Sequence, residues 1–148
     1  MINRLVVVFE SLEKHNVRYL VIGGIAAVLY GVPRATFDLD ILIDPTEKNV
    51  SNLLAALLDA GLATAGDISV NELLEHEITV FSDRVRIDVQ TRTPGIEFAD
   101  SWGRRNTLAY QGQSFEVVSR EDLVLAKKAA GREVDLEDVR ILELPDEE

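Results

Sequence analysis

The sequence predicts a single α/β (α+β) domain in which helices pack on one mixed β-sheet. Segments with helical spacing of apolar residues alternate with segments of strand-like alternation, and two stretches have the form of β-hairpins. No repeat, linker or low-complexity tract divides the 148 residues. A chain of this length can bury about two thirds of its unfolded surface, so we expect one domain over 1–148.

The first half of the chain is predicted to hold three helices and two strands. Its buried strand is β-branched and aromatic and stops at Gly23-Gly24, whereas its second strand alternates apolar and acidic residues. Thr46 is the candidate cap of the longest helix in this half and Gly61 its stop. The expected elements are a helix over 2–14, a strand over 19–22, a helix over 25–30, a strand over 37–43 and a helix over 46–61.

The second half is predicted to hold two hairpins and three helices. Turn residues between short apolar runs indicate the hairpins. The segment from Ser119 to Asp122 resembles a capping box, and Gly131 ends the helix that follows it. The expected elements are a hairpin of 78–81 with 85–89, a helix over 96–102, a hairpin of 107–110 with 115–118, a helix up to 130 and a last helix over 135–144.

The composition excludes several classes of function. The chain has no Cys, which rules out disulfides, thiolate zinc sites and a Cys nucleophile. A net charge of −11 opposes an extended grip on a nucleic-acid backbone. No hydrolase, Walker or Rossmann signature is present. Because no signal peptide is visible and the uncharged run 19–33 is too short to span a bilayer, we expect a cytoplasmic protein without a membrane segment.

Three aspartates form the candidate catalytic centre. Asp38 and Asp40 alternate along one predicted strand and therefore point to the same face, and Asp88 lies on the polar face of another strand. Carboxylates from neighbouring strands are the hard oxygen ligands that Mg²⁺ prefers, and two ions would serve phosphoryl transfer. The alternatives are a solvated strand face for the first pair and, for Asp88, charge balance with Arg86 and Arg92.

The residues between the buried strand and the aspartates are candidates for phosphate binding. Gly23 and Gly24 allow backbone amides to approach phosphate oxygens, although a strand-ending turn needs glycine for steric reasons alone. Arg34 could grip phosphate with two guanidinium donors or lie on the surface beside Pro33. Thr36 is a further nucleotide-binding candidate whose alternative role is to support the turn into the strand.

These residues resemble the minimal nucleotidyltransferases of the DNA polymerase β-like superfamily, above all small bacterial and archaeal members related to abortive-infection toxins. The resemblance rests on the segments 21–26, 31–40 and 121–135, the last of which has the form of a helix, a lysine, Ala-Gly-Arg and an aspartate. It implies that fold, and it implies that Gly23-Gly24 meet nucleotide phosphates.

The resemblance also implies roles for the charged residues. Asp38, Asp40 and Asp88 would be the metal ligands, and Lys127 would contact phosphate. Many members have Gly-Ser where this chain has Gly23-Gly24. For Lys127 the plain alternative is a solvated helix residue, and Arg132 with Asp135 could form a structural ion pair.

The expected function is transfer of a nucleoside monophosphate from a nucleoside triphosphate to a hydroxyl of a protein, a tRNA end or a small molecule, with release of pyrophosphate. Mg²⁺ is the expected cofactor, with two ions or with Mn²⁺ in its place. One alternative is a partner-binding module of a toxin–antitoxin pair with little or no catalysis, and acidic charge would suit a basic partner. Another is a homo-oligomeric structural domain with solvated aspartates.

Overall fold

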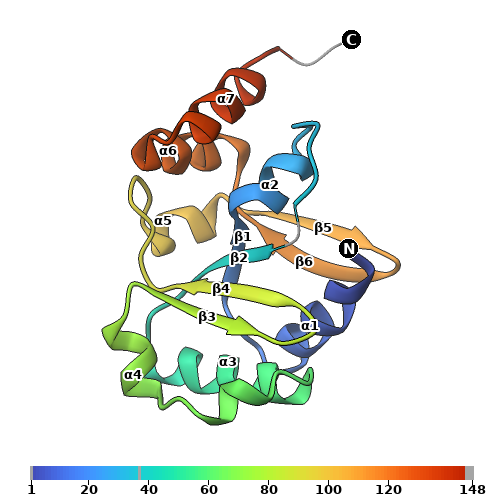
Figure 1. Ribbon diagram of the computed structural model, residues 1–148, viewed down its shortest axis with the longest axis vertical. Helices are drawn as coiled ribbons and strands as arrows, with labels where there is room; N and C mark the ends of the chain where they lie inside the picture. The colour runs from blue at the N-terminus through green and yellow to red at the C-terminus, as the bar shows by residue number, and fades with distance from the viewer. Residues whose placement is uncertain (1, 37, 146–148) are drawn as a thin grey trace.

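The computed structural model describes residues 2–36 and 38–145, with side chains from residue 4 onward. Helices and strands alternate along the chain, and the C-terminal helices lie apart from the N-terminal one (Figure 1). The elements are α1 (Ile2–Lys14), β1 (Tyr19–Ile22), α2 (Gly23–Leu29), β2 (Asp38–Ile43), α3 (Glu47–Asp59), the 3₁₀ turn η1 (Ala63–Gly66), α4 (Val70–Glu75), β3 (Ile78–Ser82), β4 (Arg86–Gln90), α5 (Phe98–Gly103), β5 (Asn106–Tyr110), β6 (Gln113–Val117), α6 (Arg120–Ala130) and α7 (Glu133–Leu142).

One six-stranded mixed sheet forms the centre of the molecule, in the order β3-β4-β2-β1-β6-β5. β2 pairs with β4, and β1 with β6, in parallel, whereas the other neighbours are antiparallel. The sequence segment between β2 and β4 contains α3, η1, α4 and β3. The predicted class, a mixed sheet with helices packed on it, is therefore confirmed.

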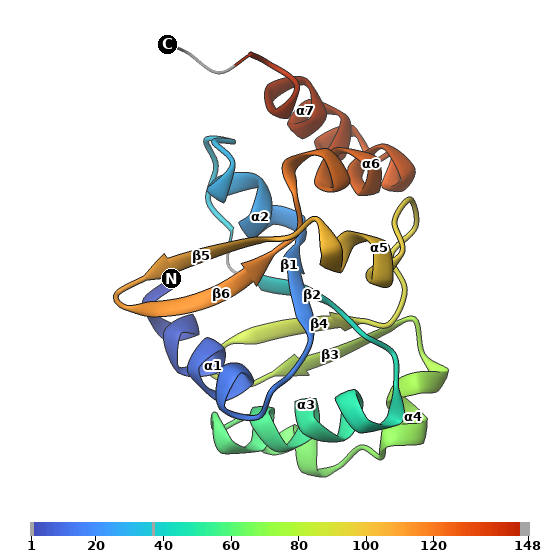
Figure 2. The same ribbon diagram turned by 180° about the vertical axis from the view of Figure 1, so that it is seen from behind.

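Two groups of helices pack around the sheet: α1, α3 and α4 form one group, and α2, α6 and α7 form the other. α1 and α3 pack against each other, and α1 packs also on β6; α4 lies beside α3. α2 packs on β1 and β2 and is followed outward by α6 and then α7, as both views show (Figures 1 and 2). In the core, the Phe9 ring stacks on Tyr19 and on Phe115 and so joins α1 to the two parallel strands β1 and β6.

Most predicted elements are present, with shifted ends. The helix expected over 25–30 begins earlier, at Gly23, because the φ angle of Gly23 is +69° and turns the chain directly from β1 into α2. The last helix begins at Glu133 and ends at Leu142. Phe37, which was expected to open the second strand, lies outside the described residues.

Two short elements and one cap differ from the expectation. The turn η1 and helix α4 are not predicted by the apolar pattern; α4 is held by a capping box of Ser69 and Glu72. At α6, Ser119 accepts a hydrogen bond from the Asp122 backbone N–H as expected, but the Asp122 carboxylate binds Arg104 through two hydrogen bonds of 3.0 and 3.1 Å. The predicted capping box is therefore only half formed.

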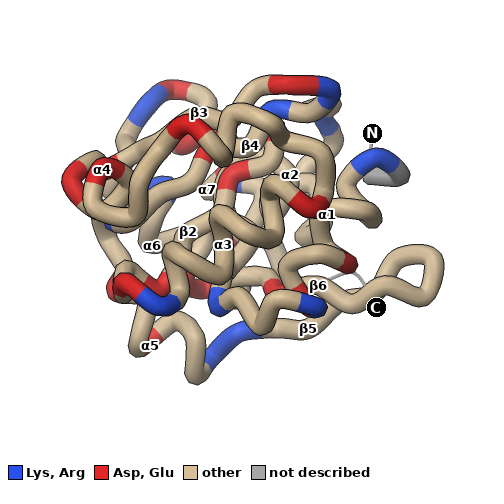
Figure 3. Tube along the Cα trace, turned by 90° about the horizontal axis from the view of Figure 1, so that it is seen from below, with Lys and Arg blue, Asp and Glu red and all other residues tan. Residues whose placement is uncertain are grey.

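Across residues 2–36 and 38–145, no helix combines the length and the apolar character needed to cross a membrane. Acidic and basic positions are spread over several elements (Figure 3).

Candidate active site

The pairing of β2 with β4 brings the predicted aspartates to one face of the sheet. Asp40 is the register partner of Asp88, and Asp38 is the partner of Arg86. The residues between them, such as Leu39 and Ile87, are completely buried on the opposite face. Period-two alternation thus sends the apolar side chains into the core and the carboxylates outward together.

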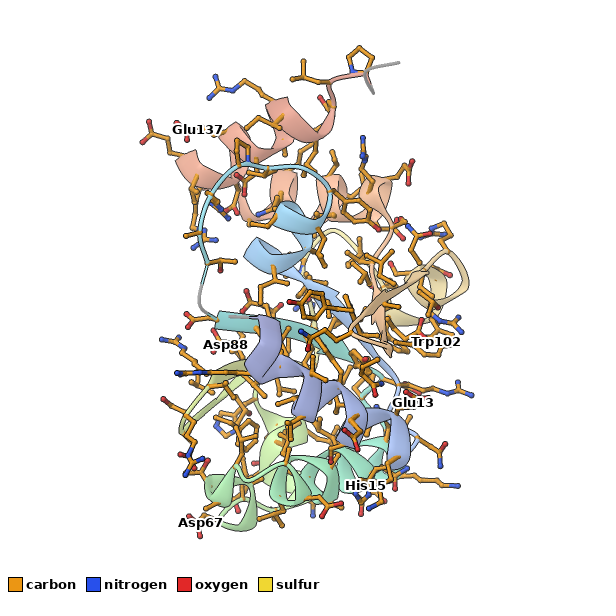
Figure 4. All side chains as sticks on the ribbon, turned by 90° about the vertical axis from the view of Figure 1, so that its right-hand side faces the viewer. Glu13, His15, Asp67, Asp88, Trp102 and Glu137 are labelled. Carbon is orange, nitrogen blue, oxygen red and sulfur yellow. The ribbon has the colours of Figure 1, made fainter. Side chains whose placement is uncertain are left out.

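A cleft of about 610 Å³ lies over this face. It is lined by every residue that the sequence assigned to catalysis or nucleotide binding: Gly23, Gly24, Arg34, Thr36, Asp38, Asp40, Asp88 and Lys127. The structure therefore brings together residues from α2, the segment 31–36, β2, β4 and α6. Asp88 lies on the opposite side of the molecule from Trp102 (Figure 4).

The two glycines lie at the start of α2, where a side chain would collide with residues of the cleft. A Cβ on Gly23 would fall on Asp40 Oδ2. A Cβ on Gly24 would lie 2.9 Å from Thr36 Oγ1 and 3.4 Å from Arg34 Nη2. Among the described side chains, none caps the first turn of α2. Glycine is thus required here for close packing, and both glycines line the cleft at the start of α2.

Buried ion pairs join Lys127 to helix α7. The Lys127 side chain is only 5% exposed, and its Nζ lies 2.8 Å from Asp138 Oδ2 and 3.4 Å from Asp135 Oδ1. The alternative of a solvated helix lysine is therefore wrong. Arg132 pairs with Asp135 at 2.7 Å, which is the structural ion pair considered from the sequence.

Arg34 belongs to the same group of charges. Its Nη2 lies 2.9 Å from Asp138 Oδ2, so one buried carboxylate faces both Arg34 and Lys127. The Arg34 Nε is buried and has no hydrogen-bond partner among the residues that the structure describes. Arg34 is thus not an unpaired surface arginine, because it pairs with Asp138 and its side chain is only 30% exposed.

Arg86 is bound to the aspartate centre from the side of β4. Its Nε lies 3.0 Å from Asp88 Oδ1 and its Nη2 3.3 Å from Asp88 Oδ2, while Asp38 Oδ2 is 3.7 Å from Nε. The charge balance considered for Asp88 is thus present, with Arg86 as the partner. The Asp88 side chain is 17% exposed and that of Asp38 45%, so Asp88 lies deeper in the cleft.

Asp40 has a strongly perturbed acidity. Burial, followed by the negative charges of Asp88 and Asp38, raises the pKa of Asp40 from 3.8 to about 7, and the nearby Lys127 opposes this rise. Each cause other than Lys127 disfavours a negative charge on Asp40. A concentration of carboxylates whose charge is incompletely balanced is typical of catalytic and cation-binding sites.

The chemistry of the donor set fits magnesium, whereas its arrangement is not that of a preassembled site. All three carboxylates offer hard oxygen ligands on one face. Within 2–36 and 38–145, however, no three carboxylate or imidazole side chains converge closely enough to hold a metal ion as they stand. In this arrangement the Asp88 carboxylate is paired with Arg86.

The sequence reasoning missed residues that complete the cleft and its supports. Gln90 and Thr93 line the cleft beyond Asp88, and Asp138 supports Arg34 and Lys127. Gln90 continues the period-two alternation from Asp88, and Asp138 follows Asp135 at helical spacing. Those spacings were the available signals.

The fold is that of a nucleotidyltransferase-like protein. The structure is similar to the crystal structure of an antigenic nucleotidyltransferase-like protein from Paracoccidioides brasiliensis, with a TM-score of 0.58, 20% sequence identity and coverage of 93% of this chain and 72% of that one. At this identity the likeness concerns the fold.

The sequence itself gives the family. Residues 3–147 match the family described as nucleotidyltransferase of unknown function (DUF6036), and the chain belongs to it. No protein with curated annotation matches the sequence. The resemblance to the superfamily is thus confirmed at the level of nucleotidyltransferases, and the narrower likeness to toxin-related members stays a prediction.

Proposed function

We propose that the protein transfers a nucleoside monophosphate from a nucleoside triphosphate to a hydroxyl group and releases pyrophosphate. The observation that carries the proposal is the register of two parallel strands. It sets Asp40 beside Asp88, with Asp38 on the same face, at the floor of one cleft. A chance pair of exposed aspartates would not share that cleft with glycine amides and a buried lysine.

The phosphate end of the cleft is assigned to α2 and α6. Gly23 and Gly24 offer backbone N–H groups at the start of α2, where phosphate oxygens would find donors. Lys127 and Arg34 line the same side and carry positive charge. Asp138 holds both cations in place, and a triphosphate would meet them already oriented. Thr36 Oγ1, beside Gly24, adds a hydroxyl.

Asp38, Asp40 and Asp88 would hold Mg²⁺, as one or two ions, or Mn²⁺. When bound, such ions neutralise phosphate charge and lower the pKa of an attacking hydroxyl. The chain's own contribution is the oxygen donor set and its fixed strand register.

The transfer step is a substitution at the α-phosphorus. The acceptor oxygen forms a bond to that phosphorus, the bridging bond to the β-phosphate breaks, and pyrophosphate leaves with the bonding electrons. The hydroxyl proton passes to a carboxylate oxygen of Asp88, which lies deep in the cleft. Arg86, which pairs with this carboxylate, must release it first. Protein, tRNA and small-molecule hydroxyls are the acceptors to be compared.

Calorimetry of ATP, GTP, CTP and UTP with and without Mg²⁺ tests the proposal, together with pyrophosphate release. We expect Mg²⁺-dependent binding in the wild type and its loss in Asp38→Asn and Asp40→Asn with the fold intact. Asp88→Asn should reduce transfer by about 100-fold or more. Asp67→Asn is the matched control, because Asp67 is exposed and lies far from Asp88 (Figure 4).

Two results would contradict the proposal. Retained turnover in Asp38→Asn or Asp40→Asn would remove the aspartates from catalysis. Absence of binding by all four triphosphates at millimolar concentration would favour the alternative, a partner-binding module with a nucleotidyltransferase fold.

A further inference from the structure

Gln90 extends the row of polar side chains beyond the aspartates. It follows Asp88 by two positions on β4 and therefore shares its face of the sheet. Across the strand pair it faces Ile78, its register partner on β3. Both residues line the cleft, together with Thr93 and Pro94 from the segment after β4.

The orientation of the Gln90 amide is fixed by its neighbour. The Thr93 hydroxyl donates a hydrogen bond of 2.6 Å to Gln90 Oε1. Thr93 is 8% exposed, so the hydroxyl is held inside the protein and its bond is protected from water. The Gln90 Nε2 donates no hydrogen bond to any residue in the described part of the chain. The bond from Thr93 identifies Oε1 as the end of the amide that faces Thr93, so the Nε2 donors are left to bind a ligand.

Apolar surfaces flank these donors. Ile78 is 52% exposed, and Pro94 is exposed as well, so both present apolar surface to solvent. Val80, the partner of Asp88 on β3, is 48% exposed as well. Two N–H donors between apolar walls suit a flat heterocycle that carries a hydrogen-bond acceptor on its edge.

We propose that Gln90, oriented by Thr93, is a specificity-determining residue that binds a nucleobase through a carbonyl oxygen on the base edge. The inference rests on the proposed nucleotidyl transfer and adds the substrate feature that this end of the cleft selects. Guanine, cytosine and uracil carry such a carbonyl, whereas adenine offers only ring nitrogens to these donors, so we expect adenine to be the disfavoured base. The base belongs either to the donor triphosphate or to the terminal nucleotide of an RNA acceptor, since both offer the same chemistry.

The donor is tested by the dissociation constants of the four triphosphates with Mg²⁺ in the wild type and in Gln90→Met. We expect ATP to bind most weakly to the wild type, and Gln90→Met to bind GTP, CTP and UTP about fivefold to tenfold more weakly, with a smaller effect on ATP. Thr93→Val should reproduce this loss of preference, and Thr93→Ser, which keeps the hydroxyl, should restore it. The double variant should show no further loss, because Thr93 acts through Gln90.

The acceptor is tested by the binding of short RNA oligonucleotides with adenine, guanine, cytosine or uracil at the 3′ end, in the presence of Mg²⁺ and a nonhydrolysable triphosphate. If Gln90→Met removes a base preference in oligonucleotide binding but not in triphosphate binding, the subsite belongs to the acceptor. Thr91→Val is the matched control: its hydroxyl donates to the His76 carbonyl and lies outside the cleft. We expect wild-type preferences in this variant.

The outcomes separate this inference from the proposed function. If triphosphates bind with Mg²⁺ and Asp38→Asn abolishes binding, but Gln90→Met and Thr93→Val leave both base rankings as in the wild type, then the base-selecting role is overturned and the proposed function stands. If neither triphosphates nor oligonucleotides bind to the wild type, the proposed function fails and the base subsite with it.

Discussion

Gly23 and Asp40 depend on each other at the scale of single residues. Gly23 has a positive φ of +69°, and a Cβ there would meet Asp40 Oδ2. We expect Gly23→Ala to destabilise the fold by about 2–4 kcal/mol, through backbone strain and through displacement of the Asp40 carboxylate. Urea unfolding and Mg²⁺ titration measure the two effects.

Gly112→Ala provides the comparison for Gly23→Ala. Gly112 has a φ of +80°, but a Cβ there would meet no atom within 4 Å. This variant should show only the strain, about 1 kcal/mol, and normal Mg²⁺ binding. Equal losses of stability and of Mg²⁺ binding in the two variants would contradict the close contact between Gly23 and Asp40.

Arg86 competes with a metal ion for Asp88. Its guanidinium makes two hydrogen bonds to that carboxylate, of 3.0 and 3.3 Å. Arg86→Gln should therefore strengthen the binding of Mn²⁺ or Mg²⁺ severalfold in the absence of nucleotide, measured by calorimetry. Arg84→Gln is the control, since Arg84 is also exposed and does not line the cleft. Weaker metal binding in Arg86→Gln would show that the arginine organises the site.

At the scale of elements, α7 lines the cleft beside α6 and supports its cations. Asp138, 3% exposed, stabilises two cations that line the cleft, Lys127 and Arg34. Asp138→Ala leaves them without this carboxylate in a buried setting, and we expect a loss of about 3 kcal/mol in the free energy of unfolding, together with weaker triphosphate binding. Glu137→Gln, on the exposed face of α7 (Figure 4), should change neither quantity. An unchanged free energy of unfolding in Asp138→Ala would mean that the cations find other partners.

The elements differ in how well the sequence predicts them. β2 and β4 follow from strict alternation around Asp38, Asp40 and Asp88, and α3 from helical spacing between Thr46 and Gly61. α4 is too short for a periodic pattern, and its signal is the local Ser69–Glu72 capping box. The start of α2 was missed because a glycine pair reads as a turn, whereas tertiary contact with Asp40 makes glycine necessary inside the helix.

The candidate site was predictable in its members and only partly in its contacts. Residue type and spacing identified every assigned member of the cleft except Lys127, which was assigned from the resemblance to nucleotidyltransferases. The pairing of Asp88 with Asp40 depends on which strands become neighbours, and the intervening α3, α4 and β3 leave this open at the level of sequence. The ion pairs of Lys127 could not be predicted because burial of a lysine depends on how α7 packs.

At the scale of the whole molecule, the acidity of Asp40 links the site to folding. Its pKa is about 7 in the folded chain and 3.8 in the reference state. Between these pH values the folded state holds a proton that the unfolded state has lost, so the metal-free protein should lose stability as pH rises from about 4 to about 7. The loss contributed by Asp40 should be roughly 2–4 kcal/mol. Unfolding by urea across this range measures it.

Asp40→Asn is the test of this assignment, because an amide does not titrate. The variant should match the wild type near pH 4 and exceed it in stability above pH 7. Saturating Mg²⁺ should reduce the difference by stabilising the ionised wild type. Parallel pH profiles for wild type and variant would show that Asp40 titrates normally.

The register between β2 and β4 determines both the stability of the sheet and the arrangement of the aspartates in the cleft. A slip of β4 by one residue would turn Asp88 toward the core, where Val89 is now completely buried, and would bring Val89 to the face that carries Asp40. The misaligned chain would bury a carboxylate among aliphatic side chains. The apolar face of the sheet therefore disfavours the wrong strand register. A chain that has paired these strands incorrectly would be both unstable and inactive. The register that gives a stable fold is thus also the one that places Asp40 beside Asp88.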